Sequence, residues 1–194
     1  MNELLNRRPI VIALAGPNGA GKSSFYRIYL EKSGLPFINA DLLALRTGLD
    51  AYKAAELAED IRQSLFARRE SFIFETVFSD PVGAKLQTLT QAQAAGYTVL
   101  LVFIGVDSPE TSAVRVDMRV SKGGHDVPRD KLMERFARVM RNLERALVEL
   151  ENVRVYDNSD LDMPYRRVAS RDEGQDVVVC NPIPAWLRPL LPRK

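Results

Sequence analysis

The sequence predicts a protein of the α/β class, in which helices cover both faces of a mainly parallel, five-stranded sheet. Short apolar runs rich in β-branched residues alternate along the chain with longer amphipathic segments, which is typical of successive β–α units. The first apolar run, Ile10–Ala15, leads directly into the glycine-rich stretch GPNGAGKSS at residues 16–24. Such a stretch connects a buried strand to a helix. We therefore expect three layers, with the sheet in the middle.

The expected elements follow one another from the N-terminus as strand, then helix. The predicted strands are Pro9–Ala15, Pro36–Asn39, Ser71–Glu75, Tyr97–Gly105 and Asn152–Tyr156. The predicted helices cover residues 22–33, 50–69, 81–95, 109–120 and 128–151. Asp50 is expected to cap the start of the second helix, and Gly96 to end the third.

The C-terminal part, residues 160–194, departs from this alternation. Tyr165–Ala169 and Asp176–Cys180 indicate two short strands of a hairpin, joined by a polar turn. Four prolines then make the closing segment irregular, and Trp186 is its expected anchor.

The composition is that of one globular domain, since the 194 residues are 46% hydrophobic and 27% charged. We expect a single domain over residues 1–194, with its core at residues 9–159. The formal net charge is only +2 and basic residues are spread along the chain, so we expect neither a nucleic-acid nor a membrane partner. The single cysteine, Cys180, suits a reducing compartment. We expect a cytoplasmic protein.

Residues 16–24 match the phosphate-binding pattern G-x-x-x-x-G-K-S in its required place between a strand and a helix. Its glycines let backbone N–H groups point at phosphate, while Lys22 is expected to reach the β- and γ-phosphates and Ser23 to bind Mg²⁺. No guanine-reading N-K-x-D segment occurs, so we expect ATP. The predicted nucleotide-binding residues are Gly16, Pro17, Asn18, Gly19, Ala20, Gly21, Lys22, Ser23 and Ser24. The loop predicts a P-loop NTPase or kinase fold.

Two carboxylates lie at the ends of predicted strands, on the sheet edge where open α/β proteins bind ligands. Asp41 follows the second strand and is predicted to accept the proton of a substrate hydroxyl; the alternative is that it caps a helix beginning at Leu42. Glu75 ends the third strand, expected beside the first. It is predicted to hold Mg²⁺ through water or, with Thr76, to bind substrate hydroxyls. A polar strand end without such a role is the alternative.

An arginine-bearing helix, residues 109–120, runs into a Gly-Gly segment that also contains the only histidine, His125. We interpret this segment as a lid in which His125 contacts substrate or steadies the lid. Arg119 and Arg135, the latter at the edge of the next helix's apolar face, are predicted to stabilise charge on the γ-phosphate during transfer. Three arginines nearly opposite that face are expected in solvent: Arg138, Arg141 and Arg145.

The order of these features resembles the zeta toxin family, in particular a short bacterial group described as predicted ABC-type ATPases. The stretches that carry the resemblance are GPNGAGKSS, FINAD, FIFET, RVSKGGHDVP and YDNSD. Zeta toxins are similar to small P-loop kinases and phosphorylate the 3′-hydroxyl of the N-acetylglucosamine moiety of UDP-N-acetylglucosamine. The resemblance implies that Lys22 is the P-loop lysine, that Asp41 activates the acceptor hydroxyl, and that Arg119 and Arg135 surround the γ-phosphate. Asn158 lies where P-loop kinases often contact adenine, although Asp-Asn-Ser is also an ordinary turn.

The resemblance implies an ATP- and Mg²⁺-dependent kinase of a nucleotide sugar, acting as the toxin of a toxin–antitoxin pair with a separate antitoxin protein as partner. Two other functions fit the same residues. One is a housekeeping kinase of a small metabolite, similar to shikimate, gluconate or chloramphenicol kinases. The other is a nucleotide-gated binding module whose lid signals occupancy to a partner protein. The C-terminal hairpin and tail do not match the substrate-binding additions of the long toxins, which leaves the acceptor open.

Overall fold

The structure is a computed structural model in which residues 2–121 and 128–192 are described. The helices are α1 (Asn2–Leu5), α2 (Lys22–Phe25), α3 (Ala40–Thr47), α4 (Ala51–Ala67), α5 (Ala84–Ala94), α6 (Pro109–Val120) and α7 (Arg129–Glu149). A π-helical turn, η1 (Tyr26–Leu30), and two 3-10 turns, η2 (Glu31–Ser33) and η3 (Arg188–Leu190), add to these. The strands are β1 (Ile10–Ala15), β2 (Phe37–Ile38), β3 (Phe72–Thr76), β4 (Thr98–Gly105), β5 (Asn152–Asp157), β6 (Arg166–Arg171) and β7 (Val178–Val179).

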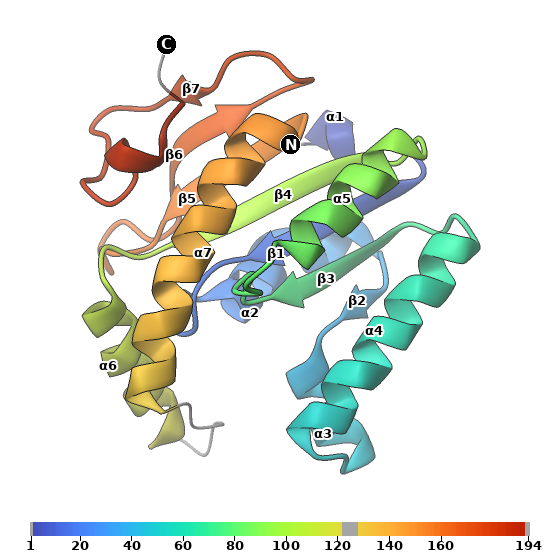
Figure 1. Cartoon of the computed structure of the whole chain (residues 1–194), viewed down its shortest axis with the longest axis horizontal. Coiled ribbons are helices and arrows are strands. Elements are labelled where there is room, and N and C mark those ends of the chain that lie inside the picture. Colours follow the sequence, from blue (N-terminus) through green and yellow to red (C-terminus); the bar gives the residue numbers. More distant parts are fainter. Residues whose placement is uncertain (1, 122–127, 193–194) are drawn as a thin grey trace.

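One sheet organises the chain, with the strand order β2-β3-β1-β4-β5-β6-β7 (Figure 1). The strands from β2 to β5 in this order are parallel, β6 pairs antiparallel with β5, and β7 pairs antiparallel with β6. β1 lies between β3 and β4. Because parallel strands end at the same edge of a sheet, the segments that follow β1, β2, β3 and β5 gather at one edge, where ligands bind in open α/β folds.

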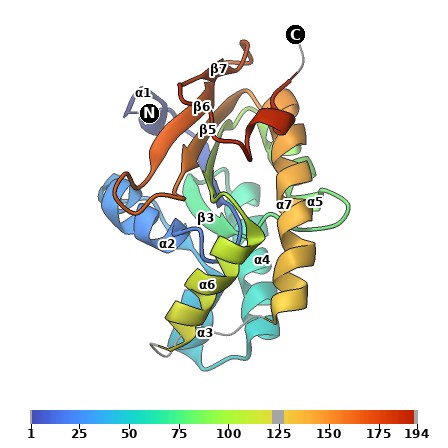
Figure 2. The same cartoon turned by 90° about the vertical axis from the view of Figure 1, so that its left-hand side faces the viewer.

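Alternate residues of β1 face two different cores. The odd-numbered residues pack with α4, α5 and α7, and the even-numbered ones with α1 and α2. All six residues of the strand are fully buried, as expected for a central strand of a parallel sheet covered on both faces. Figure 2 shows α7 and α5 on one side of the sheet and α2 on the other. The α/β class and the three layers predicted from the sequence are confirmed.

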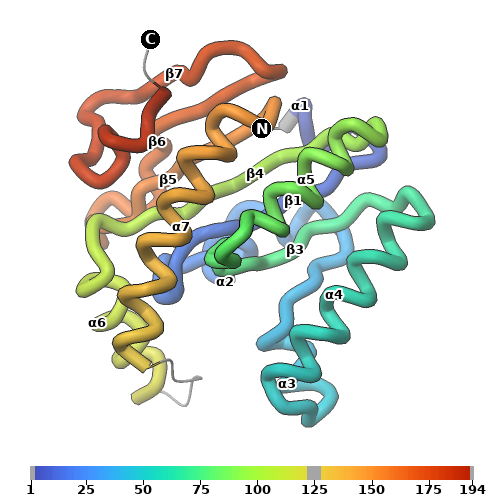
Figure 3. Tube along the Cα trace, in the orientation of Figure 1, coloured from blue at the N-terminus to red at the C-terminus, as the bar shows by residue number. Residues whose placement is uncertain are grey.

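Three local features differ from the sequence prediction. The C-terminal hairpin does not stand apart, because β6 pairs with β5 and the sheet has seven strands rather than five. Figure 3 shows the chain of β6 running beside that of β5. The sequence indicates a helix after the second strand only in the alternative that begins at Leu42, whereas α3 begins at Ala40. The predicted helix over residues 22–33 is present in extent, but it changes from α to π and then to 3-10 geometry.

Trp186 anchors the closing segment, as predicted. Its Nε1–H donates a hydrogen bond to Asp157 Oδ1 at 3.1 Å, and a Cβ on Gly105 would lie 2.3 Å from its ring. The neighbouring Leu187 is fully buried in the core shared with α7. The tail is therefore packed onto the carboxyl ends of β4 and β5. In residues 2–121 and 128–192, no helix combines the length and the apolar character needed to cross a membrane.

Candidate active site

The segment after β1 forms a loop with the backbone geometry of an anion-binding site. Gly16, Gly19 and Gly21 have φ angles of 143°, 71° and 94°, which residues with a side chain rarely adopt. A Cβ on Gly16 would lie 2.1 Å from the carbonyl oxygen of Ile104, so the loop leaves the sheet in close contact with β4. Glycine turns of this kind are typical of loops whose N–H groups bind phosphate.

Lys22 begins α2 and is buried, with its ammonium group folded back onto the loop. Nζ donates to the carbonyl oxygens of Gly16 and Pro17, both at 3.0 Å, and lies 3.9 Å from Glu75 Oε1. Burial lowers the pKa of Lys22 and Arg119 lowers it further, while the nearby carboxylates oppose the shift. An anion that binds beside this buried ammonium group stabilises its charged form and so offsets the cost of its desolvation.

Glu75 joins three elements at the centre of the site. Its Oε2 accepts hydrogen bonds from Ser23 Oγ of α2 and from Asn39 Nδ2, which follows β2, each at 2.9 Å. Hydroxyl and carboxylate oxygens are ligands that Mg²⁺ prefers, usually together with waters and substrate phosphates, so Ser23 and Glu75 fit this ion. Within the described ranges, no group of three or more His, Cys, Asp or Glu side chains gathers as a metal site.

Asp41 lies in the first turn of α3 with an exposed side chain. Asn39 caps this helix, because its Oδ1 accepts a hydrogen bond from the Leu42 N–H at 3.0 Å. The interpretation of Asp41 as the helix cap is therefore wrong. Its carboxylate instead lines two hollows beside the phosphate loop.

A hollow of about 620 Å³ lies over the phosphate loop. Among the described residues that line it, four are basic and one, Glu75, is acidic. The lining residues are Gly19, Gly21, Lys22, Ser23, Ser24, Arg27, Glu75, Arg115, Met118 and Arg119. This excess of positive charge suits a polyphosphate. We call it the phosphate hollow.

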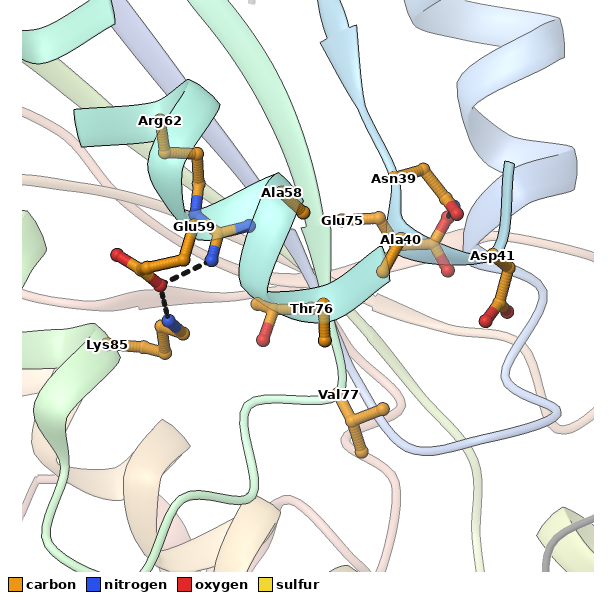
Figure 4. Close-up of a pocket in the computed structure, with 11 residues that line it drawn as sticks. Asn39, Ala40, Asp41, Ala58, Glu59, Arg62, Glu75, Thr76, Val77 and Lys85 are labelled. Carbon is orange, nitrogen blue, oxygen red and sulfur yellow. Dashed lines mark hydrogen bonds and ion pairs between the residues drawn. The ribbon is translucent and has the colours of Figure 1, made fainter. Parts of the chain in front are cut away.

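Two further hollows share Asn39 and Asp41. The smaller, about 280 Å³, is drawn in Figure 4 and is lined by Asn39, Ala40, Asp41, Ala55, Ala58, Glu59, Arg62, Glu75, Thr76, Val77 and Lys85. The larger, about 540 Å³, is lined by Ser23, Tyr26, Arg27, Glu31, Phe37, Asn39, Asp41, Leu42, Leu43 and Arg46. The phosphate hollow shares Glu75 with the smaller hollow, and Ser23 and Arg27 with the larger one. All three therefore converge on the carboxyl ends of β1, β2 and β3.

A network of ion pairs lines the smaller hollow, across from Asp41 (Figure 4). Glu59 of α4 accepts hydrogen bonds from Arg62 at 2.5 Å, from Gln63 at 2.9 Å and from Lys85 of α5. Partial burial opposes ionisation of Glu59, but these three donors outweigh it and lower its pKa to about 2. The network ties α4 to α5 and keeps fixed charges of both signs in the hollow.

The predicted lid residues differ in their placement. Arg119, in the last turn of α6, lines the phosphate hollow and lies close enough to lower the pKa of Lys22. Arg135 of α7 is half-buried and is not among the residues that line the three hollows, so its contact with the γ-phosphate stays a prediction. His125 lies outside the described residues. Arg138, expected in solvent, is only 20% exposed and pairs with Glu134.

Asn158 is buried against the outer side of the phosphate loop. Its Nδ2 donates to the carbonyl oxygen of Ala20 at 2.8 Å, and its Oδ1 accepts from the Tyr165 N–H at 3.3 Å. Both ends of the amide are thus bonded within the chain, and the adenine contact stays a prediction. Thr76 lines the smaller hollow, as its predicted role requires, while its Oγ1 accepts from the Phe78 N–H at 3.1 Å.

Sequence reasoning missed three residues of the site. Asn39 both caps α3 and bonds Glu75. Arg27 lines the phosphate hollow and the larger hollow, and its place four residues after Ser23 was an available signal, because such pairs share a helix face. Arg115 lines the phosphate hollow and donates to the carbonyl oxygens that follow β5. Its place four residues before Arg119 was an available signal for the hollow, but no local pattern predicts its contact with the segment after β5.

Comparison with known sequences identifies one family. The sequence model described as Zeta toxin matches residues 48–168, which is more than half of the chain. The matched part includes Glu75, Arg119, Arg135 and Asn158, whereas the phosphate loop and Asp41 precede it. No curated protein matches the chain.

Solved structures share the fold at low sequence identity. A chain of the AvrRxo1-ORF1:AvrRxo1-ORF2 complex with sulphate ions has a TM-score of 0.70 at 21% identity, covering 93% of this chain and 64% of that one. The complex with ATP gives 0.69 at 22% identity, with 92% and 64% covered. A chain from the PezAT chromosomal toxin-antitoxin system of Streptococcus pneumoniae gives 0.61 at 19% identity, with 84% and 72% covered. The present chain thus spans less than two thirds of the length of the AvrRxo1 chains.

Proposed function

We propose the function of this protein from its family, because the chain belongs to the zeta toxin family. In this proposal the protein is an ATP- and Mg²⁺-dependent kinase that transfers the γ-phosphate of ATP to a hydroxyl of a nucleotide sugar similar to UDP-N-acetylglucosamine. The observation that carries the proposal is the convergence of the cation-rich phosphate hollow with two hollows that share Asp41. A phosphate donor and a hydroxyl acceptor need such adjoining sites.

The donor side consists of the phosphate loop and its cations. Lys22 exchanges its hydrogen bonds to two loop carbonyls for bonds to phosphate oxygens. Arg119 stabilises the charge that develops on the transferred group, and its position in the lining of the phosphate hollow supports this role. Ser23 and Glu75 would hold Mg²⁺, which neutralises charge on the β- and γ-phosphates when bound.

Asp41 serves the acceptor side. Its carboxylate takes the proton of the acceptor hydroxyl while the hydroxyl oxygen forms a bond to the γ-phosphorus; the bond from that phosphorus to the bridging oxygen breaks, and ADP leaves. Asn39 holds Asp41 in place by capping α3, and its amide also bonds Glu75. The proton-accepting carboxylate and the Mg²⁺-binding carboxylate are thereby fixed relative to each other.

The two hollows beside Asp41 support an acceptor with two parts. The smaller hollow, about 280 Å³, has the size for one sugar and carries polar groups that bond hydroxyls. The larger hollow contains Tyr26 and Phe37, whose stacked rings lie 3.7 Å apart, together with Arg27 and Arg46. This lining suits a nucleoside and its phosphates.

In this proposal the protein acts as the toxin of a toxin–antitoxin pair, with a separate antitoxin chain that occludes the nucleotide site. The PezAT structure is described as belonging to a toxin-antitoxin system, and the AvrRxo1-ORF1 structures contain AvrRxo1-ORF2. Induced expression tests this part of the proposal. We expect growth arrest with the intact protein and none with Asp41→Asn.

A housekeeping kinase of a small metabolite is the second candidate. It is favoured by the smaller hollow, because this hollow accommodates a molecule of monosaccharide size beside Asp41 without use of the larger hollow. Kinase activity without growth arrest would support this candidate over the toxin.

The first experiment measures transfer of labelled γ-phosphate from Mg·ATP to a panel of UDP-sugars and to small sugars and polyols. Lys22→Ala and Asp41→Asn are the inactive controls, and Asp60→Asn, an exposed carboxylate on α4, is the matched active control. The proposal is supported if the unchanged protein and Asp60→Asn label a UDP-sugar, whereas Lys22→Ala and Asp41→Asn do not. Labelling of a small sugar alone favours the metabolic kinase, and ATP binding without any transfer favours a nucleotide-gated binding module.

A further inference from the structure

Three side chains from distant parts of the chain hold the phosphate loop from its outer side. One lies on α6, one follows β5, and one precedes β6. The hydrogen bonds run from Ser112 Oγ to Asn18 O at 2.6 Å, from Asn158 Nδ2 to Ala20 O at 2.8 Å, and from Tyr165 Oη to Gly21 O at 2.9 Å. Together with the bonds from Lys22, they give partners to most of the carbonyl groups of the loop.

These hydrogen bonds fix the direction in which the carbonyl groups of the phosphate loop point. Carbonyl groups that bond to the surrounding protein leave the N–H groups of a glycine-rich turn free to face the opposite, concave side. Ser112 and Asn158 are buried and Tyr165 is half-buried, so the three donors are largely shielded from competing water. A loop fixed in this way does not need to be ordered by its ligand.

The second glycine of the phosphate-binding pattern shows how close this contact is. A Cβ on Gly21 would lie 2.7 Å from Asn158 Nδ2 and 2.8 Å from Tyr165 Oη. Any side chain at this position would therefore push both donors away. Glycine here serves the contact with Asn158 and Tyr165 as well as the positive φ angle of 94°.

The same contacts fix α6, which carries Arg119. Ser112, Arg115 and Arg119 recur at helical spacing on one face of α6. Ser112 bonds the loop, Arg115 donates to the carbonyl oxygens of Asn158 and Ser159 at 2.6 and 3.0 Å, and Arg119 lines the phosphate hollow. The helix is thus attached at its start to the loop and at its middle to the segment after β5.

We propose that Ser112, Asn158 and Tyr165 are positioning residues that hold the phosphate loop in its anion-binding shape before the nucleotide arrives. In this view residues 158–165, between β5 and β6, are part of the nucleotide site rather than a simple connection. The proposal rests on the proposed function only in taking ATP as the anion. The shape of the loop is a property of the protein without nucleotide.

Tyr165→Phe is the most specific test, because it removes the hydroxyl and keeps the ring against Phe25, at a centroid distance of 5.3 Å. Tyr29→Phe is the matched control, since its ring also contacts Phe25 and Tyr165 while its side chain is exposed. Two quantities are measured: hydrogen exchange of residues 16–24 without nucleotide, and the dissociation constant for Mg·ATP by calorimetry. Ser112→Ala provides a second variant at another point of the loop.

We expect Tyr165→Phe and Ser112→Ala each to speed exchange in residues 16–24 and to weaken ATP binding by about 3- to 10-fold. Tyr29→Phe should match the unchanged protein in both measurements. The proposal is overturned if both variants exchange and bind like Tyr29→Phe, or if exchange rises equally throughout the sheet. If the unchanged protein binds no ATP, the proposed function fails, and the exchange measurement still decides whether these side chains hold the loop.

Discussion

The two sides of the candidate site differ in charge and in how firmly they are built. The phosphate side follows a fully buried central strand, is bonded by side chains from three other parts of the chain, and is lined by four basic residues. The acceptor side follows β2, a strand of only two residues, and presents an exposed Asp41 on α3. Under the proposed function, backbone geometry specifies the phosphate side, whereas side chains specify the acceptor.

Asp41→Asn should give the largest effect and should separate the two sides. The amide keeps the size of the side chain but accepts no proton, so kcat should fall by about 10²- to 10⁴-fold. The dissociation constant for ATP should change little, because Asp41 does not line the phosphate hollow and only its charge reaches Lys22. Steady-state transfer assays and calorimetry measure the two quantities, with Asp60→Asn as control. Loss of ATP binding together with transfer would mean that the two sides are not separate.

Arg119→Ala tests the phosphate side. Because Arg119 lines the phosphate hollow, its removal should lower kcat by about 10²- to 10³-fold. Arg135 does not line that hollow, and we expect Arg135→Ala to cost only about tenfold in kcat. The matched control is Arg141→Ala, an exposed arginine on the same helix. If Arg135→Ala behaves like Arg141→Ala, the prediction of a γ-phosphate contact for Arg135 is wrong.

Glu75→Gln tests the residue that both sides share. Glutamine still accepts hydrogen bonds from Ser23 and Asn39, but it lacks the charge that attracts Mg²⁺. We expect the apparent affinity for Mg²⁺ to fall by about 10- to 100-fold, and excess Mg²⁺ to restore much of the rate at saturating ATP. The rate as a function of Mg²⁺ concentration measures this, with Glu144→Gln on the exposed side of α7 as control. A deficit that Mg²⁺ does not relieve would assign Glu75 to the substrate instead.

The phosphate loop and its strand were predictable because their signals are local. A continuous apolar run predicts a strand buried on both faces, and the adjoining glycines and Lys22 specify the loop. The expected position of the third strand beside the first is also confirmed, since Leu14 of β1 pairs with Glu75 of β3. The prediction that Glu75 lies at the site thus followed from the rule that parallel strands end at the same edge of a sheet.

The contacts that complete the site were not predictable, because they join residues far apart in the sequence. Ser112 and Asn18 are separated by 94 positions, and Tyr165 and Gly21 by 144. No local pattern marks these residues as donors to the loop. Helical periodicity likewise placed Arg138 away from the apolar face of its helix. Periodicity predicts the direction in which a side chain points, but it does not predict which other parts of the chain pack against it.

Glu59→Gln should give the smallest effect, on the stability of the acceptor side. The pKa of Glu59 in the folded protein, about 2, lies below the ordinary value of 4.5. Its ionised form therefore stabilises the fold above about pH 4.5, and this contribution is lost as the pH falls from there towards 2. We expect Glu59→Gln to lower the free energy of unfolding by about 1–2 kcal/mol near neutral pH. That is less than the full shift corresponds to, because water screens a carboxylate that is 36% exposed.

Urea unfolding of the unchanged protein and of Glu59→Gln at about pH 7 and at about pH 3.5 measures this contribution. The difference between the two proteins should shrink at the lower pH, because the unfolded chain then binds a proton at Glu59 that the folded protein binds only weakly. Glu56→Gln, exposed on the same helix, should not differ from the unchanged protein at either pH. A difference that stays constant with pH would mean that glutamine disturbs the packing between α4 and α5. The charges of Arg62 and Lys85 would then contribute little to holding the acceptor side together.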